Sequence, residues 1–437
     1  MSALAVPVVF AELGWMLMTV VDTIMVGRIG PAAIGATGVG GSVFYSFAIF
    51  GMGLLLGLDT LVSQSWGAGD RDDCHHSLSQ GIYIALAGTP CLMILFAFMP
   101  PLFSAFGVNG QVSALAGPFL TTLSASTLPL LLYAAFRRYL QGTGHVRPVM
   151  FVLLTANLIN LLFNWLLIEG HAGFRALGVV GSALSTCIAR VYMAAMLAAF
   201  IWWFERSTEL GLRTLIRRPD FRRLRLLLRI GLPAATQILL EVSAFGAAAL
   251  LAGRLTAAAL AAHQIAITCA ALSYMVPLGV SSAAAVAVGQ AIGQRNPGLA
   301  RRRGFIALGL ACVFMLFSAT CFLLFPKQIL HIYTNDSSVL LTGTGLLALA
   351  ALFQLFDGIQ TVATGALRGL GNTRIPMLVN LAGYWLFGLP IGYALCFYFG
   401  FGIFGLWWGL TISLVVIAMV LLRYWQLCSR VPLPHQY

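Results

Sequence analysis

The sequence predicts an all-α polytopic membrane protein with twelve transmembrane helices. Of its 437 residues, 60% are apolar and only 9% are charged, whereas an ordinary soluble domain carries about 25% charged residues. Apolar residues fill long blocks such as 76–104, 177–204, 301–326 and 402–422. A helix needs about 20 apolar residues to cross the hydrocarbon core, and a spanning β-barrel would show short alternating segments instead.

Twelve apolar segments follow one another along the chain. We expect the spans at 3–28, 33–66, 76–104, 112–137, 147–169, 177–204, 229–253, 256–292, 301–326, 339–367, 374–400 and 402–425. Cytoplasmic loops are enriched in basic residues, and with a cytoplasmic N-terminus 20 of the 25 lysines and arginines fall on that side. We therefore expect a multi-pass protein of the inner (plasma) membrane with both termini in the cytoplasm. This bias accounts for the net charge of +12 without any nucleic-acid partner.

The chain is expected to form two similar halves. We divide it into an N-lobe at 1–204, a basic cytoplasmic loop at 205–228 and a C-lobe at 229–437. Three pairs of short motifs share one and the same offset along the chain; they contain Pro7 and Pro233, Gly27 and Gly253, and Gln64 and Gln290. Six spans per half give a parallel internal repeat, an arrangement that places a substrate site between the halves and permits alternating access.

Acidic residues inside the spans are the main functional signal, because charges in the membrane are costly and by default mark function. The five are Glu12, Asp22, Asp59, Glu241 and Asp357. Of the basic residues, only Arg190 is expected in a position to neutralise them, so the interior should be electronegative. Carboxylates of this kind can bind a proton, a sodium ion or a cationic substrate, and competition among the three is the physical basis of antiport. For Glu12 and Asp59 a purely structural role is an equally good interpretation.

Polar neighbours could complete such a site. Asn160 and Asn164 are four residues apart and share one helix face. Amide oxygens beside a carboxylate would suit sodium, although hydrogen bonds between helices are the alternative. His263 is interpreted as a satisfied histidine at a helix interface, with a proton-sensing role as the alternative.

Metal and disulfide chemistry find little support in the sequence. Asp72, Asp73, His75 and His76 are expected in a solvated cytoplasmic loop. The eight cysteines are scattered, and no pair has the CxxC spacing of a zinc or redox site. We therefore expect no cofactor, and no metal other than a possible sodium ion at the carboxylates.

Several motifs in order resemble the multidrug and toxic compound extrusion (MATE) family, and most of all its NorM-type branch. They are Val21-Asp22-Thr23 with Gly27, Leu58-Asp59-Thr60-Leu61, Gly142-Thr143-Gly144, Ala262-His263-Gln264 and Leu367-Arg368-Gly369 with Gly371. The resemblance covers essentially the whole chain. It implies two six-helix lobes that export amphipathic organic cations in exchange for sodium ions or protons.

The resemblance also implies roles for single residues. Asp22 matches the acidic residue of the N-lobe, and Glu241 and Asp357 match the acidic pair of the C-lobe. The polar positions of helices five and six correspond to Asn160, Asn164 and Thr186, and Asp59 and Gln264 are secondary candidates. At Phe353 the NorM pattern can have a tyrosine, so a hydroxyl ligand is missing there. The implied partners are small organic cations and the lipid bilayer, with the chain functional as a monomer.

Two other function classes fit less well. A flippase for lipid-linked precursors carries anionic pyrophosphates and needs basic residues in its cavity, where the sequence offers only Arg190. An intramembrane enzyme needs clustered catalytic motifs such as HExxH or DDxxD, and neither occurs. We therefore expect a transporter and not an enzyme.

Overall fold

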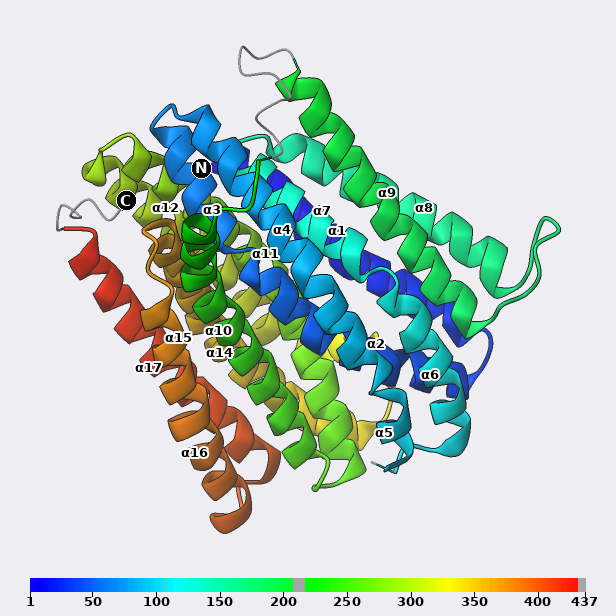
Figure 1. Cartoon of the computed structure of the whole chain (residues 1–437). Helices are drawn as coiled ribbons and strands as arrows, with labels where there is room; N and C mark the ends of the chain where they lie inside the picture. Colours follow the sequence, from blue (N-terminus) through cyan, green and yellow to red (C-terminus); the bar gives the residue numbers. More distant parts are fainter. Residues whose placement is uncertain (106, 207–216, 431–437) are drawn as a thin grey trace. The chain divides into compact units, whose positions relative to one another are not determined.

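The computed structural model describes residues 1–105, 107–206 and 217–430, and every regular element within them is a helix (Figure 1). The chain forms two compact units. The N-unit comprises Phe10–Ala235, and the C-unit comprises Met1–Val9 together with Thr236–Tyr437. The predicted fold class, an all-α polytopic membrane protein, is confirmed.

The described part of the N-unit consists of nine helices and the first turns of a tenth. They are α1 (Ser2–Gly27), α2 (Pro31–Leu54), α3 (Gly57–Gly67), α4 (Arg71–Ala97), α5 (Pro100–Ala105), α6 (Gly110–Ser124), α7 (Thr127–Gly142), α8 (Val146–Ile168), α9 (Val179–Glu205) and the start of α10 (Phe221–Ala252). Helices α8 and α9 lie side by side, as do α2 and α6 (Figure 1).

The C-unit contains the start of α1 up to Val9, the rest of α10 from Thr236 and the elements that follow. They are α11 (Ala257–Gly293), α12 (Pro297–Leu324), α13 (Pro326–His331), α14 (Ser337–Gly369), α15 (Arg374–Asn380), the π-helix η2 (Leu381–Gly388), α16 (Leu389–Tyr393), the π-helix η3 (Ala394–Tyr398) and α17 (Gly402–Cys428). Helix α14 packs against α11, α12 and α17 and so forms the centre of this unit.

The helices account for the expected spans. Within the described residues, eleven helical stretches are long and apolar enough to cross a membrane, and a twelfth results when α6 and α7, bent by 48°, are taken as one broken span. The break has a local cause: the Ser126 and Thr127 hydroxyls bond to the carbonyl oxygens of Leu123 and Ser124, both at 2.6 Å. Such side-chain bonds compete with the helical backbone ladder. Most boundaries agree within a few residues, but α10 begins at Phe221 rather than at 229.

The internal repeat is visible in the turns. Asp70 caps α4 through the backbone N–H of Asp73, and Asn296, at the equivalent position of the second half, caps α12 in the same way. The residues just before the two caps, Gly69 and Arg295, have φ angles of 80° and 56°. An arginine in the left-handed backbone region is uncommon. The second unit therefore keeps the turn of the first, although Arg295 stands where the first has Gly69.

Two long helices belong to both units. Helix α1 up to Val9 packs in the C-unit, and α10 up to Ala235 packs in the N-unit, so the two breaks fall at equivalent positions of the repeat. Close backbone packing fixes both ends. A Cβ at Gly231 would lie 2.0 Å from the Leu54 carbonyl oxygen, and one at Gly279 would lie 2.8 Å from the Val9 Cα. Only glycine permits these approaches.

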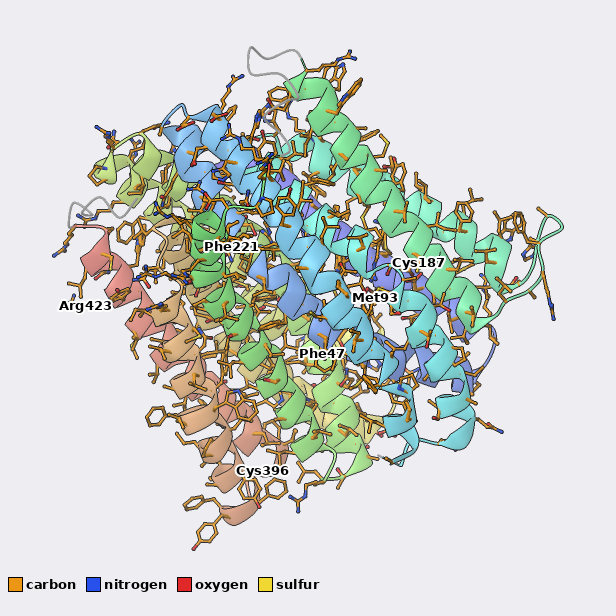
Figure 2. All side chains as sticks on the ribbon, in the orientation of Figure 1. Phe47, Met93, Cys187, Phe221, Cys396 and Arg423 are labelled. Carbon is orange, nitrogen blue, oxygen red and sulfur yellow. The ribbon has the colours of Figure 1, made fainter. Side chains whose placement is uncertain are left out.

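Apolar side chains cover the outside of the helices. Leu341 of α14 is 81% exposed, and Val313 of α12 and Leu250 of α10 are also largely exposed. Figure 2 shows side chains projecting outward along the helices, among them that of Phe221 at the start of α10. A surface of this kind is matched to lipid, because water cannot solvate so many apolar groups.

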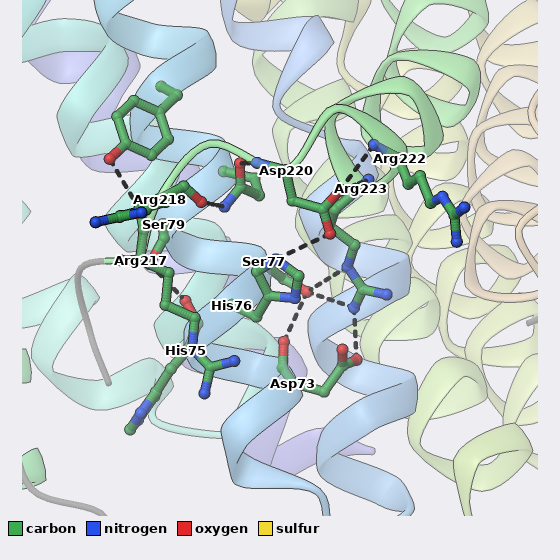
Figure 3. A network of polar contacts seen from close by, with 12 residues as sticks. Asp73, His75, His76, Ser77, Ser79, Arg217, Arg218, Asp220, Arg222 and Arg223 are labelled. Carbon is green, nitrogen blue, oxygen red and sulfur yellow. Dashed lines mark hydrogen bonds and ion pairs between the residues drawn. The ribbon is translucent and has the colours of Figure 1, made fainter. Parts of the chain in front are cut away.

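The end of the basic inter-lobe segment is fastened to α4 (Figure 3). Tyr83 and Gln80 donate to the carbonyl oxygens of Arg217 and Arg218, at 2.8 and 3.2 Å. Asp220 accepts from the backbone N–H of Arg222, which holds the pKa of this carboxyl below its usual value. The segment therefore enters α10 through an ordered, capped turn.

The acidic start of α4 is not the solvated loop that the sequence suggests. Asp72 pairs with Arg217, and Asp73 pairs with Arg223 (Figure 3). His75 is fully buried and lies 3.1 Å from Glu205 at the end of α9. The prediction was wrong because the arginines that neutralise these acids are far away in the chain and are not visible in the local sequence.

Candidate functional site

The N-unit gathers one acidic residue and a set of polar side chains. Asp22 of α1 accepts hydrogen bonds on both oxygens: Asn164 of α8 donates to Oδ1 at 2.6 Å, and Thr186 of α9 donates to Oδ2 at 3.1 Å. Asn164 also donates to Asn160 at 3.2 Å, one turn earlier on the same face of α8. The four N-unit residues predicted as a site therefore lie together, and we call them the Asp22 cluster.

A further layer holds the Asp22 cluster in place. Asn160 donates to the Ser185 hydroxyl, and that hydroxyl donates back to the Asn160 carbonyl oxygen at 2.7 Å. Asn157, also on α8, donates to the Gly14 carbonyl oxygen at 3.0 Å and so ties α8 to α1. Buried amides that are bonded in this way position the carboxylate rather than leaving it mobile.

Arg190 lies on α9 one turn after Thr186 and is buried. Its guanidinium donates to the Ser126 hydroxyl at 2.6 Å and to the Tyr45 hydroxyl at 3.2 Å, and lies 4.7 Å from the Phe44 ring centroid. Asp22 lies within electrostatic range of this cation. The N-unit thus contains a positive charge that offsets the charge of its central acid.

Two further acids of the N-unit have arginine partners. Glu12 of α1 forms a buried pair with Arg137 of α7, and Asp59 of α3 lies 3.3 Å from Arg138 of α7. The expectation that only Arg190 could neutralise an interior acid was therefore wrong. The fourth span was expected to end at 137, whereas α7 continues to Gly142 and places Arg137 and Arg138 within the helix.

The C-unit has a different arrangement. Glu241 of α10 and Asp357 of α14 are bridged by Gln360, whose carboxamide nitrogen donates to Glu241 at 3.1 Å and to Asp357 at 3.2 Å. Gln360 and Asp357 are three residues apart on one helix face. In the described part of this unit, no basic side chain lies within 4 Å of either carboxylate. We call these three residues the Gln360 bridge.

Aromatic rings pack beside the Gln360 bridge. Phe245 contacts both Phe353 and Tyr384, with ring centroids 5.9 and 5.8 Å apart, and Phe353 also contacts Trp407. Phe353 therefore has an apolar surrounding and no hydroxyl to offer. Tyr384 of η2 is fully buried, its hydroxyl has no hydrogen-bond partner in the part of the chain that the structure describes, and it lies within electrostatic range of both acids.

The two secondary candidates lie outside both clusters. Asp59 is fully buried in its pair with Arg138, and the Gln264 side chain is exposed on α11. Gln360 was not among the predicted residues, although its i+3 spacing from Asp357 was a usable signal. His263 is buried as expected and accepts from the Trp407 indole N–H at 3.1 Å.

The chemistry available is that of hard cations and protons. Among the described residues, no three His, Cys, Asp or Glu side chains gather as a transition-metal site would require. Carboxylate, amide and hydroxyl oxygens dominate both clusters, and these are ligands that small hard cations prefer.

The family model MatE matches the chain twice, at residues 7–166 and 233–394. The chain belongs to the MatE family. Both matches begin at a proline, Pro7 and Pro233, which is one of the residue pairs that mark the sequence repeat. The NorM-type resemblance is confirmed by relatives. The chain is 35% identical over 439 residues to "Probable multidrug resistance protein NorM" of Mesorhizobium japonicum, covering 99% of this chain and 94% of that protein.

Further comparisons agree with this assignment. A protein of the same name from Pseudomonas putida is 35% identical over 423 residues, covering 96% of this chain and 92% of that protein. The crystal structure of the eukaryotic MATE transporter AtDTX14 has the same fold, with a TM-score of 0.88 at 22% identity, covering 98% of this chain and 96% of that one. An outward-facing multidrug resistance MATE family transporter gives a TM-score of 0.89 at 20% identity, covering 98% and 95%.

Proposed function

We propose that this protein is a secondary active antiporter that exports amphipathic organic cations in exchange for sodium ions or protons. The observation that carries the proposal is the Gln360 bridge, where two carboxylates lie together without a basic partner among the described residues. Two such charges in a membrane unit need a cation or protons to balance them. An exporter that couples two cation flows needs a site of this kind.

The comparisons support the transport class. Relatives at 35% identity are named multidrug resistance proteins, and the solved structures of the same fold include multidrug transporters. The arginine distribution supports a multi-pass inner-membrane protein with both termini in the cytoplasm. Each cluster is formed by a single chain, so we propose that the monomer is the functional form.

The proposed exchange rests on competition. A cationic substrate and a coupling ion are both attracted to the same carboxylates. Binding of either one therefore lowers the affinity of the site for the other. Release of the substrate on the outside then follows binding of the coupling ion, because one set of negative charges balances only one of them at a time. The Asp22 cluster, with its amide and hydroxyl groups, is proposed as the second place where a cation or a proton acts.

The test uses purified protein in liposomes with either a sodium gradient or a pH gradient, and an ethidium-type dye as the transported cation. We expect dye movement under one gradient and loss of it in Glu241→Gln. Glu169→Gln is a matched control, because Glu169 is a partly exposed acid at the end of α8 that lies near Arg28. Folded protein that moves dye under neither gradient would contradict the proposal.

A further inference from the structure

Gln360 holds an unusual position between the two C-unit acids. Its side chain is 1% exposed, and one carboxamide nitrogen donates to Glu241, to Asp357 and, at 3.4 Å, to the Thr361 hydroxyl. Among the described residues, no other side chain donates a hydrogen bond to either carboxylate, and the buried carbonyl oxygen of the same amide has no hydrogen-bond partner.

The nitrogen and the oxygen of this amide therefore differ in their hydrogen bonding. The N–H groups carry partial positive charge and face two carboxylates, which is the place that a small cation would occupy. The carbonyl oxygen is left without a donor, which is costly for a buried acceptor. Rotation about the last side-chain bond exchanges the nitrogen and the oxygen without moving the backbone, because that torsion is broad and roughly two-fold.

We propose that the Gln360 carboxamide takes the place of the coupling cation while the C-unit site is empty, and turns its carbonyl oxygen to the cation when the site fills. This inference rests on the proposed function. The amide N–H groups compete with the cation for Glu241 and Asp357, so they weaken its binding and help its release. After rotation the oxygen joins the carboxylates as a neutral ligand.

Gln360→Met is the direct test, since methionine has a similar length and no hydrogen-bonding N–H. Without the competing amide, we expect the concentration of the driving cation at half-maximal dye transport to fall about tenfold, because two hydrogen bonds to charged groups are lost. The maximal rate should also fall, since release now leaves two unbridged carboxylates. If protons drive transport, the same change moves the half-maximal pH upward.

The matched control is Gln354→Met on the same helix. Gln354 is equally buried, but its carbonyl oxygen accepts from Ser273 and Ser318 at 2.8 and 3.1 Å. In the described residues, no hydrogen bond joins it to Glu241 or Asp357. We expect this variant to keep the wild-type half-saturating concentration. The ionisable groups that act on one another here, Glu241, Asp357, Tyr384 and Tyr274, are unchanged in both variants.

The outcomes separate the two proposals. If wild type moves dye, Glu241→Gln does not, and Gln360→Met keeps the wild-type half-saturating concentration, the inference about Gln360 fails and the antiport function stands. If wild type moves dye under neither gradient, the function itself fails.

A second variant tests the inference if Gln360→Met folds poorly. Gln360→Glu is nearly isosteric, and its added carboxylate removes the competing N–H groups. The stabilisation of this purified variant by sodium chloride over choline chloride, or by low pH, should reach its midpoint at a lower cation concentration than in wild type. An unchanged midpoint would overturn the inference.

Discussion

The two units handle interior acids in opposite ways. In the N-unit, Asp22 receives hydrogen bonds from an amide and a hydroxyl and lies near Arg190, and Glu12 and Asp59 each pair with an arginine. In the C-unit, two acids share a single amide donor. The units share a backbone repeat but not its electrostatics: Glu12 and Asp59 have arginine partners that suit a role in holding the fold, whereas we propose that the two acids of the C-unit act on a transported ion.

The largest effect on stability is expected at Glu12. Glu12→Gln leaves Arg137 charged and buried without its partner, which should cost about 3–5 kcal/mol in the free energy of unfolding. Thermal unfolding of the detergent-solubilised protein measures this. Glu12→Gln combined with Arg137→Met should recover most of the loss, since no unpaired charge remains. If Glu12→Gln is as stable as wild type, Glu12 does not hold the fold, and the contrast drawn between the acids of the two units fails.

For the two acids of the Gln360 bridge we expect no loss of stability and a large loss of transport. Glu241→Gln and Asp357→Asn remove one of two adjacent negative charges, so we expect thermal stability to be kept or raised. Gradient-driven dye transport should fall roughly 100-fold, the size of a strong coupling free energy. Transport assays and unfolding curves on the same preparations check both halves of the prediction. A variant that unfolds early would show that the acid is structural.

For Asp22 we expect a loss of stability smaller than that for Glu12. Asp22→Asn keeps an oxygen for one donor but leaves Arg190 without the opposing charge, so a loss of about 1–3 kcal/mol is expected. Thermal unfolding measures the loss, and Asp22→Asn combined with Arg190→Met should regain part of it. If the double variant is no more stable than the single one, Arg190 does not balance Asp22.

The smallest effect concerns the turn that enters α10. The backbone N–H of Arg222 lowers the pKa of Asp220 from its ordinary value of 3.8. The stability that this cap adds to the turn is therefore present above that value and is lost as the pH falls through the lower, folded-state pKa. Protease cleavage within 217–223 should increase slightly in acid for wild type and be insensitive to the same change in Asp220→Asn. Equal pH dependence in both proteins would mean that the cap is unimportant.

The spans were predictable because hydropathy and arginine position are local properties. The Asp22 cluster could be predicted by resemblance, since Asp22 lies within a recognisable motif and Asn160, Asn164 and Thr186 match polar positions of the family's helices five and six. The pairs Glu12–Arg137 and Asp59–Arg138 could not be predicted, because they join residues 125 and 79 positions apart through tertiary packing. The π-helices η2 and η3 were also missed; they flank Pro390, which lacks the N–H of a regular helix.

The exchange of helix ends has a consequence for biosynthesis. A ribosome makes Met1–Val9 well before the remaining residues of the unit in which this segment packs, which begin at Thr236. The N-unit in turn needs the start of α10, which is translated after the basic segment. In a nascent chain that stops at the end of α9, the start of α1 therefore lacks the residues of its own unit, and the N-unit lacks the start of α10. Assembly of either half is complete only when both have been inserted.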